Sequence, residues 1–359
     1  MKILYISPEH ISGTLPLFCQ GHRKKGNHAR YLTLFPTPFD FPEDLSLKLY
    51  LHPDKNWIIQ SRKLLQKIRG IDFQLEKEGN PPFWSPAGWI EKCFFDFRDW
   101  LNAAKIYRFV EQNKLYEYDL FHLEQGMGIF RDARLIKQWK QAGKKFACFY
   151  HGNDVRNRGV FSAVHQISDL NLTSELDLMA KYPGIKYLFL PIDTDAVRPQ
   201  ARNNERLKIV HAARSRYNKG SDFIIQTVKD LEKDYPVELV LIENMPHDKC
   251  MELKAECDIC IDQIADKGGW GYGMSSVESL AQGLAVCTYL NPQYQAFIPD
   301  HPFVNVDYNN LRSELIRLIQ SADYRQEMSV RGRDWLVKTH SINAVMDQLY
   351  IYYQEAGII

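Results

Sequence analysis

Two cationic side chains follow a short apolar run in the second half of the sequence. Residues 209–213 have the pattern of a buried β-strand, Arg214 follows this strand, and Lys219 precedes a helical pattern. Ligands of parallel sheets bind at the carboxyl edge of the strands, so we expect both cations above that edge. A guanidinium and an ammonium there suit a diphosphate, which gains negative charge as a bond to it breaks. Two solvated surface charges are the alternative interpretation.

A glycine-rich stretch, residues 268–273, leads into another helical pattern. Ser275 is the predicted N-cap, so backbone N–H groups near Met274 and Ser275 and the positive end of the helix dipole would receive a phosphate. Glu278, one turn further, would accept hydrogen bonds from both ribose hydroxyls of a nucleotide. An acidic residue that merely complements the helix dipole is the alternative interpretation of Glu278.

These motifs resemble those of the retaining GT-B glycosyltransferases of family 4. Ala213-Arg214 and Lys219-Gly220 resemble the Gly-Arg and Lys-Gly pairs of that family, and residues 273–283 resemble its Gly-Leu-x3-Glu-Ala-x-Ala-x-Gly segment. Glu278 matches the second glutamate of the family's Glu-x7-Glu motif, whereas Trp270 stands at the position of the first. This departure concerns the group that would contact the hydroxyls of the donor sugar.

The N-terminal half carries further matches to the same family. Residues 26–33 and 119–122 resemble segments that mark its fold, and His151-Gly152-Asn153-Asp154 resembles its His-Gly-x-Asp segment. The resemblance implies that His151 lies beside the reacting sugar and that Asp154 helps to bind the donor. Gly13 is similar to the loop glycine that approaches the donor phosphate, although the family's second glycine is absent. Without the family, a lone histidine after a strand is interpreted as structural.

The resemblance implies transfer of a sugar from a nucleoside diphosphate sugar to a glycan, lipid-linked or other acceptor, with retention of configuration. His151, Arg214 and Lys219 are then the predicted catalytic residues, and Gly13 and Glu278 belong with Asp154, Met274 and Ser275 to the predicted donor site. Two other hypotheses stay open. One is a non-hydrolysing nucleotide-sugar epimerase, and the other is a non-catalytic GT-B binding or scaffold subunit, which the Trp270 departure favours.

No metal and no cofactor are predicted. In a GT-B site, cationic side chains and a helix N-terminus take the place of a metal ion. Asp193-Thr194-Asp195 has the Asp-x-Asp spacing of a metal motif from another glycosyltransferase architecture, but it resembles the interdomain Val-Asp-Thr segment of family 4. The spacing of the His247, Cys250, Cys257 and Cys260 side chains also permits a structural zinc site. We favour a short apolar strand with buried cysteines over residues 257–261.

Two parallel sheets are needed to position these segments. The chain has 359 residues, more than one hydrophobic core usually serves, and short apolar runs alternate with amphipathic stretches. This alternation predicts an α/β protein with two Rossmann-like halves. The resemblance to family 4 implies that these halves form the GT-B architecture, in which two Rossmann-like domains face a central cleft. The predicted strands cover residues 2–6, 29–35, 120–124, 146–151, 170–173 and 188–191 in the first domain, and 209–213, 237–242, 259–261 and 285–288 in the second.

The predicted domain bounds follow the same alternation. An N-terminal acceptor domain covers residues 1–198, and a Pro- and aromatic-rich excursion over residues 36–118 interrupts it. The donor domain covers residues 206–340. Residues 341–359 contain an amphipathic helix that we expect to pack back toward the N-terminal domain.

The composition limits the partners. Lysine and arginine number 45 and aspartate and glutamate 44, so no bulk positive charge is present to hold a nucleic acid. Residues 1–8 do not have the pattern of a signal peptide. The seven cysteines do not have the spacing of a disulfide framework, which predicts a cytoplasmic location. Basic and apolar residues alternate over residues 48–69, which suits peripheral contact with an anionic membrane. An ordinary helix with a solvated basic face is the alternative.

Overall fold

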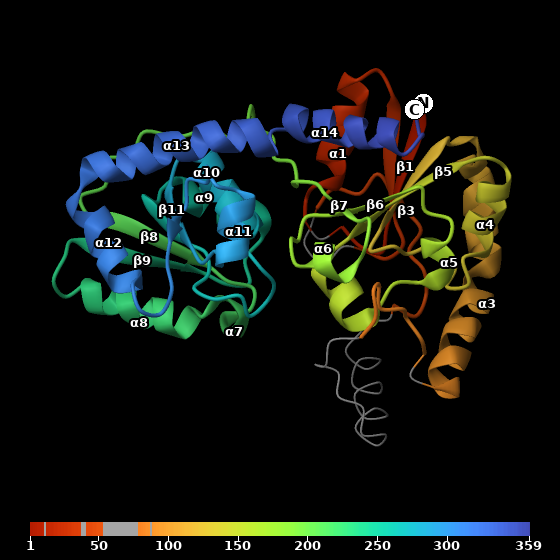
Figure 1. Cartoon of the computed structure of the whole chain (residues 1–359), viewed down its shortest axis with the longest axis horizontal. Helices are drawn as coiled ribbons and strands as arrows, with labels where there is room; N and C mark the ends of the chain where they lie inside the picture. The colour runs from red at the N-terminus through yellow and green to blue at the C-terminus, as the bar shows by residue number, and fades with distance from the viewer. Residues whose placement is uncertain (11, 37–40, 53–77, 87) are drawn as a thin grey trace. The chain divides into compact units, whose positions relative to one another are not determined.

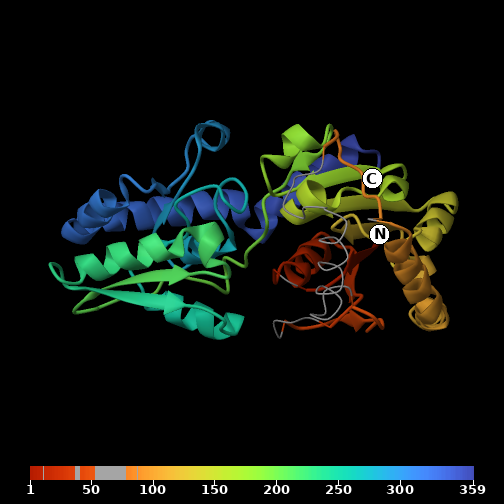
Figure 2. The same cartoon turned by 90° about the horizontal axis from the view of Figure 1, so that it is seen from below.

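The computed structural model describes residues 1–10, 12–36, 41–52, 78–86 and 88–359. The chain divides into two compact units, of which the first contains Met1–Leu188 and Gln348–Ile359 and the second contains Phe189–Asp347. Each unit is built on a parallel β-sheet with helices on its faces (Figures 1 and 2). The predicted α/β class with two Rossmann-like sheets is confirmed.

The sheet of the first unit has the order β3-β2-β1-β4-β5-β6-β7. Its strands are β1 (Lys2–Ser7), β2 (His28–Thr33), β3 (Leu45–Ser46), β4 (Leu120–Glu124), β5 (Lys145–Tyr150), β6 (Leu170–Thr173) and β7 (Lys186–Tyr187), and all pair in parallel. The chain moves from β1 to β2 and β3 on one side, and then returns to β4 on the other side of β1. The switch point of this sheet, where ligands of such folds bind, therefore lies between β1 and β4.

Helices cover the first sheet. They are α1 (Leu15–Lys24), α3 (Trp89–Gln112), α4 (Arg134–Gln141), α5 (Ser162–His165) and α6 (Leu178–Lys181), with a 3-10 turn η1 (Leu115–Glu117) and a π-helical turn η2 (Asp154–Arg158). The last helix, α14 (Ile342–Glu355), brings the C-terminal residues back to β1 and α1. There the Tyr350 hydroxyl lies 3.0 Å from His22 Nδ1, and the Tyr353 hydroxyl bonds His122. These contacts between aromatic and histidine rings hold α14 against α1 and against His122 of β4.

The sheet of the second unit has the order β12-β11-β10-β8-β9. Its strands are β8 (Leu207–Ala212), β9 (Val237–Ile242), β10 (Ile259–Ile261), β11 (Ala285–Thr288) and β12 (Val304–Asn305). Its helices are α7 (Arg216–Lys219), α8 (Ser221–Leu231), α9 (His247–Ala255), α10 (Met274–Ala281), α11 (Pro292–Phe297), α12 (Leu311–Gln320) and α13 (Ala322–His340). Helices α10 and α13 lie on one side of the sheet and α8 on the other (Figure 1). The switch point here lies between β8 and β10.

One predicted strand is misplaced, and one basic stretch of the sequence lies largely outside the described residues. The strand predicted at residues 188–191 is wrong, because β7 lies at Lys186–Tyr187 and pairs with β6 only there. Leu188 is nevertheless buried, and its backbone N–H still donates to the carbonyl of Thr173, the last residue of β6. The basic stretch of residues 48–69 lies largely outside the described residues, because residues 53–77 are not described.

Candidate functional site

The switch point of the second sheet holds Lys219 beside a buried carboxylate. Lys219 ends α7, in the connection that follows β8, and its Nζ lies 2.7 Å from Asp262 Oδ1 and 3.0 Å from Gln263 Oε1. Asp262 directly follows β10, and its side chain has no exposed surface. The ammonium of Lys219 is therefore fixed at the edge of the sheet where ligands bind in such folds.

The same carboxylate joins Lys219 to the beginning of α10. Asp262 Oδ2 accepts one hydrogen bond from the backbone N–H of Gly273 and one from the Ser276 hydroxyl, both at 2.8 Å. Although burial raises the pKa of Asp262, the charge and hydrogen bond of Lys219 lower it below its ordinary value. A charged carboxylate at this depth is tolerated because each of its oxygens is paired. The sequence prediction missed Asp262, although an acid directly after a predicted strand is a signal for it.

Helix α10 begins at Met274, and Gly273 is its N-cap. The predicted N-cap, Ser275, is therefore wrong. Asp262 binds the backbone N–H of Gly273 and thereby fixes the beginning of the helix at this residue. A side chain at position 273 would crowd Lys219, since an added Cβ would lie 3.3 Å from Lys219 Nζ. Met274 and Ser275 become the first two helical residues, whose N–H groups have no carbonyl within the helix to bind. They lie at the positive end of the helix dipole.

Arg214 comes from the same connection as Lys219. It lies beyond the end of β8 and is exposed. Both sequence-predicted cations therefore occupy the β8–α8 connection at the carboxyl edge of the sheet. Their convergence on one ligand stays a prediction.

Glu278 lies on α10, and two side chains of α9 bind its carboxylate. Its Oε1 is 2.9 Å from His247 Nε2, and its Oε2 is 2.5 Å from Lys254 Nζ. The Lys254 side chain is 1% exposed and that of Glu278 13%. Although burial raises the pKa of Glu278, the charge of Lys254 and the hydrogen bond from His247 lower it. The ribose contact of Glu278 stays a prediction, and each carboxylate oxygen keeps a second lone pair for it.

The structure does not gather the four residues of the possible zinc site into one group of ligands. His247 bonds Glu278, the Cys257 thiol donates to the Leu253 carbonyl, and Cys260 is buried within β10. Within the described ranges, no group of three or more His, Cys, Asp or Glu side chains could hold a metal ion. Asp193 Oδ1 instead accepts backbone hydrogen bonds from residues 195 and 196 and stabilises a turn.

The switch region of the first sheet holds the sequence-predicted His151. It follows β5, and its Nε2 lies 2.9 Å from Oε2 of Glu124, the last residue of the neighbouring β4. Burial lowers the pKa of His151, but the hydrogen bond and charge of Glu124 outweigh this effect and raise it to about 9. This raised pKa favours the imidazolium form of His151 at neutral pH, and 34% of its side chain is exposed. The sequence prediction missed Glu124 as its partner.

Asp154 lies beside His151 in η2 and is buried. Its Oδ2 accepts a hydrogen bond of 2.8 Å from the backbone N–H of His151, and its Oδ1 has no hydrogen-bond partner in the described part of the chain. Burial raises the pKa of Asp154 to about 6, although the charges of Arg158 and His151 act in the opposite direction. The structure thus brings His151 and Asp154 together and gives Asp154 a role in fixing the backbone of His151.

Gly13 lies between β1 and α1, next to the switch point of the first sheet. Its φ of 69° is in the left-handed region, which glycine adopts without strain. An added Cβ would also lie 3.1 Å from the Phe41 ring. This backbone conformation explains why a glycine occupies position 13. The approach of Gly13 to a donor phosphate stays a prediction.

Known proteins share the fold of this chain but not its sequence. No protein-family model matches the chain. No curated protein sequence matches it either. Solved structures match nearly all of it, and three of them serve as examples. They are HepE from Anabaena in complex with UDP (TM-score 0.55, 10% identity, 99% of this chain and 100% of that chain), TarM (0.60, 10%, 98% and 99%) and a candidate UDP-N-acetylglucosamine 2-epimerase from Listeria monocytogenes (0.53, 11%, 99% and 96%). This likeness confirms the GT-B fold class.

The buried pair of Lys254 and Glu278 generates a stability prediction. Lys254→Ala leaves the Glu278 carboxylate without its cation, so the free energy of unfolding should fall by about 3 kcal/mol, measured by urea unfolding. Lys249→Ala changes an exposed lysine of the same helix and should stay within about 0.5 kcal/mol of the parent chain. Equal stability of the two variants would contradict the pairing.

The pair of His151 and Glu124 generates a pH prediction. Since the folded pKa of about 9 lies above the unfolded value of about 6.5, the imidazolium stabilises the fold below about pH 6.5, and this stabilisation is lost as the pH rises through 9. Glu124→Gln should lower the pKa of His151 in an NMR titration and remove the loss of stability in this window. Glu117→Gln, which changes an exposed acid bound to Lys2, should leave both unchanged. An unaltered His151 titration in Glu124→Gln is the outcome that contradicts this account.

Proposed function

We propose that the chain transfers a sugar from a nucleoside diphosphate sugar to the hydroxyl group of an acceptor, such as a glycan or a lipid-linked sugar. The observation that carries this proposal is the position of Lys219. Its ammonium lies at the switch point of the second sheet, and Asp262 holds it next to the beginning of α10. A fixed cation beside free helix N–H groups is an arrangement suited to a diphosphate.

In this proposal the protein supplies the electrostatic part of the reaction. The bond between the anomeric carbon and the diphosphate oxygen breaks, a bond between that carbon and the acceptor oxygen forms, and the acceptor hydroxyl gives its proton to the departing diphosphate. Negative charge grows on the departing phosphate as its bond breaks. Lys219, Arg214 and the N–H groups of Met274 and Ser275 would stabilise this charge without a metal ion. Glu278 would bind the ribose hydroxyls. Because its carboxylate is already fixed by Lys254, it would need little rearrangement to do so.

His151 is the proposed sugar contact of the first unit. As an imidazolium it donates hydrogen bonds only, and one ring nitrogen is committed to Glu124. The other nitrogen can donate to a sugar hydroxyl, and Asp154 would keep the backbone of His151 in place. We include retention of configuration and the family 4 relationship in the proposal, on the motifs around Arg214, Lys219 and Glu278.

The solved structures suggest which donor to try first and which alternative to test. HepE has been solved with UDP and with UDP-glucose, so UDP-sugars are the first donors to offer this chain. The candidate epimerase among the similar structures supports a second candidate function, isomerisation of a nucleotide sugar. Product analysis without an acceptor separates the two, because an epimerase converts the donor and a transferase does not. Nucleotide binding without turnover in either assay would indicate a non-catalytic subunit, as Trp270 at the first glutamate position suggests.

We also propose that the chain is cytoplasmic and contacts a membrane surface peripherally. In the part of the chain that the structure describes, no helix is long and apolar enough to cross a membrane. Helix α3 supports a surface contact. Its inner side packs in the core, whereas its outer side exposes Trp89 and Trp100 at 71% each and Phe97 at 52%. Tryptophan and phenylalanine on one helix face are typical of helices that lie in the interface of a bilayer.

The donor site generates a binding prediction. A panel of UDP-, GDP-, ADP- and dTDP-sugars should contain one that raises the melting temperature, since a ligand at 100 times its dissociation constant stabilises a protein by about 2.7 kcal/mol. Lys219→Ala should weaken binding of that donor at least tenfold, because a charge-assisted hydrogen bond contributes about 1.5 to 3 kcal/mol. Arg216→Ala is the matched control in the same connection, where Arg216 pairs with Glu243. Equal weakening by both variants would count against the site.

The exposed face of α3 generates a lipid prediction. The chain should sediment with vesicles that contain anionic lipid, and the double change Trp89→Ser and Trp100→Ser should reduce the bound fraction at least fivefold. Tyr217→Ser alters an equally exposed aromatic side chain of the second unit and should have no effect. If the double variant binds vesicles as the parent chain does, α3 is not the contact.

A further inference from the structure

A fully buried lysine lies next to the proposed ribose contact of the second unit. Lys254 belongs to α9, and only 1% of its side chain is exposed, whereas lysine side chains usually reach the solvent. Burying an ammonium group costs free energy, and apolar side chains of the same volume are often as stabilising as a buried ion pair. The burial of Lys254 therefore calls for an explanation beyond the stability of the fold.

Two side chains of α9 hold the two oxygens of the Glu278 carboxylate. Lys254 Nζ lies 2.5 Å from Oε2, and His247 Nε2 lies 2.9 Å from Oε1. Lys254 is the buried partner, whereas the side chain of His247, at the beginning of α9, is 38% exposed. A further hydrogen bond of 2.7 Å, from Gln282 Nε2 to the Met251 carbonyl, joins the end of α10 to α9. The carboxylate of Glu278 is therefore fixed in place before any ligand binds.

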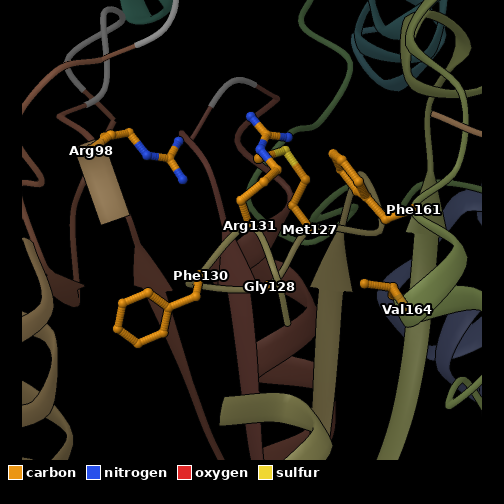
Figure 3. Close-up of a pocket in the computed structure, with 7 residues that line it drawn as sticks. All are labelled: Arg98, Met127, Gly128, Phe130, Arg131, Phe161 and Val164. Carbon is orange, nitrogen blue, oxygen red and sulfur yellow. The ribbon is translucent and has the colours of Figure 1, made fainter. Parts of the chain in front are cut away.

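A buried ion pair of the first unit illustrates a purely structural role. Asp99 binds Arg98 through Oδ1 and the backbone N–H of Arg131 through Oδ2, so it joins α3 to the loop after β4. Figure 3 shows both arginines at a small pocket of this region. The Asp99 side chain is 5% exposed, whereas that of Glu278 is 13% exposed and lies beside the partly exposed His247. A ligand can therefore reach Glu278 from the solvent.

The contacts of Glu278 leave a defined place for a ligand with two neighbouring hydroxyl groups. Each carboxylate oxygen has two lone pairs, and one on each oxygen remains after the bonds from Lys254 and His247. An ionised carboxylate accepts hydrogen bonds and donates none. The 2′ and 3′ hydroxyls of a ribose are neighbouring donors that suit two fixed oxygens. A 2′-deoxyribose would leave one oxygen without this partner in a largely buried place, which is unfavourable.

Lys254 keeps Glu278 in the state that this recognition requires. Burial raises the pKa of Glu278, but the charge of Lys254 and the hydrogen bonds from His247 and Lys254 lower it below its ordinary value. A protonated Glu278 would donate from one oxygen and would accept from hydroxyl groups only at the other. Cys250 of α9 also lies near this carboxylate, but burial raises the pKa of its thiol. Cys250 therefore stays neutral and supplies no charge in place of Lys254.

We propose that Lys254 is a positioning residue that makes the donor site select ribonucleotides over 2′-deoxyribonucleotides. Lys254 acts through the Glu278 carboxylate and does not contact the ligand itself. This role rests on the proposed transferase function, in which Glu278 binds the ribose of the donor. It narrows the class of substrate, because the donor is then a ribonucleoside diphosphate sugar. A dTDP-sugar, whose deoxyribose lacks the 2′ hydroxyl, is a poor donor.

The test compares nucleoside diphosphates that differ only in the ribose, by isothermal titration calorimetry on the full chain. UDP, GDP and ADP are titrated first, and the one that binds most tightly is compared with its 2′-deoxy and 3′-deoxy forms. The parent chain should bind the ribonucleotide at least tenfold more tightly than either deoxy form, because each lacks one hydrogen bond to a charged acceptor. Equal binding of the three forms would overturn the proposal, and this measurement needs no variant.

Variants test whether the selectivity depends on Lys254. In Lys254→Met, which roughly keeps the buried volume, the 2′-deoxy form should bind less than threefold more weakly than the ribonucleotide. A general loss of structure would weaken both forms alike and leave their ratio unchanged, so the ratio reports the positioning of Glu278. Lys254→Gln, which also lacks the charge, serves if a thermal melt shows that the methionine variant does not fold. Lys249→Met changes an exposed lysine of the same helix and should keep the parent ratio.

A failure of this proposal is distinguishable from a failure of the proposed function. Lys219→Ala should weaken the ribo and deoxy forms alike, because Lys219 would bind the diphosphate that they share. A parent-like ratio in the Lys254 variants, with binding that still depends on Lys219, would refute only the role of Lys254. If no nucleoside diphosphate binds to the chain, the donor site is refuted, and the role of Lys254 with it.

Discussion

The buried carboxylate of Asp262 is the contact on which the proposed donor site depends. A charge without exposed surface is unfavourable unless every oxygen is paired, and Asp262 meets this condition by binding Lys219, the Gly273 N–H and the Ser276 hydroxyl. These partners come from the β8–α8 connection and from the beginning of α10. One electrostatic requirement therefore fixes a cation and a helix N-terminus side by side at the edge of the second sheet.

The first unit repeats this arrangement with different residues. Glu124 ends β4, which neighbours β1 at the switch point, as Asp262 follows β10, which neighbours β8. Each acid holds a cation, His151 or Lys219, from an adjacent connection. In both units, burial of the carboxylate costs free energy, and its ion pair with the ordered cation offsets this cost. Asp99 and Arg98, which are both buried residues of α3, form a further pair of this kind.

Local sequence predicted the framework well and the pairings poorly. The strands at residues 120–124, 170–173, 237–242, 259–261 and 285–288 have the predicted bounds, because each is an apolar run with polar or breaking residues at its ends. The place of Lys219 in the connection after β8 was predicted, because it is a local property of the sequence. Asp262 was not, because its contact with Lys219 depends on the pairing of β10 with β8. The N-cap prediction at Ser275 failed for the same reason, since a distant carboxylate occupies the N–H of Gly273.

A crystal structure of the chain with UDP, or with whichever nucleoside diphosphate binds most tightly, tests the central claim most directly. The account predicts that the diphosphate lies within hydrogen-bond distance of Lys219 Nζ and of the N–H groups of Met274 and Ser275, with Asp262 still bound to Lys219. A diphosphate bound elsewhere, with Lys219 and the beginning of α10 unoccupied, would contradict it.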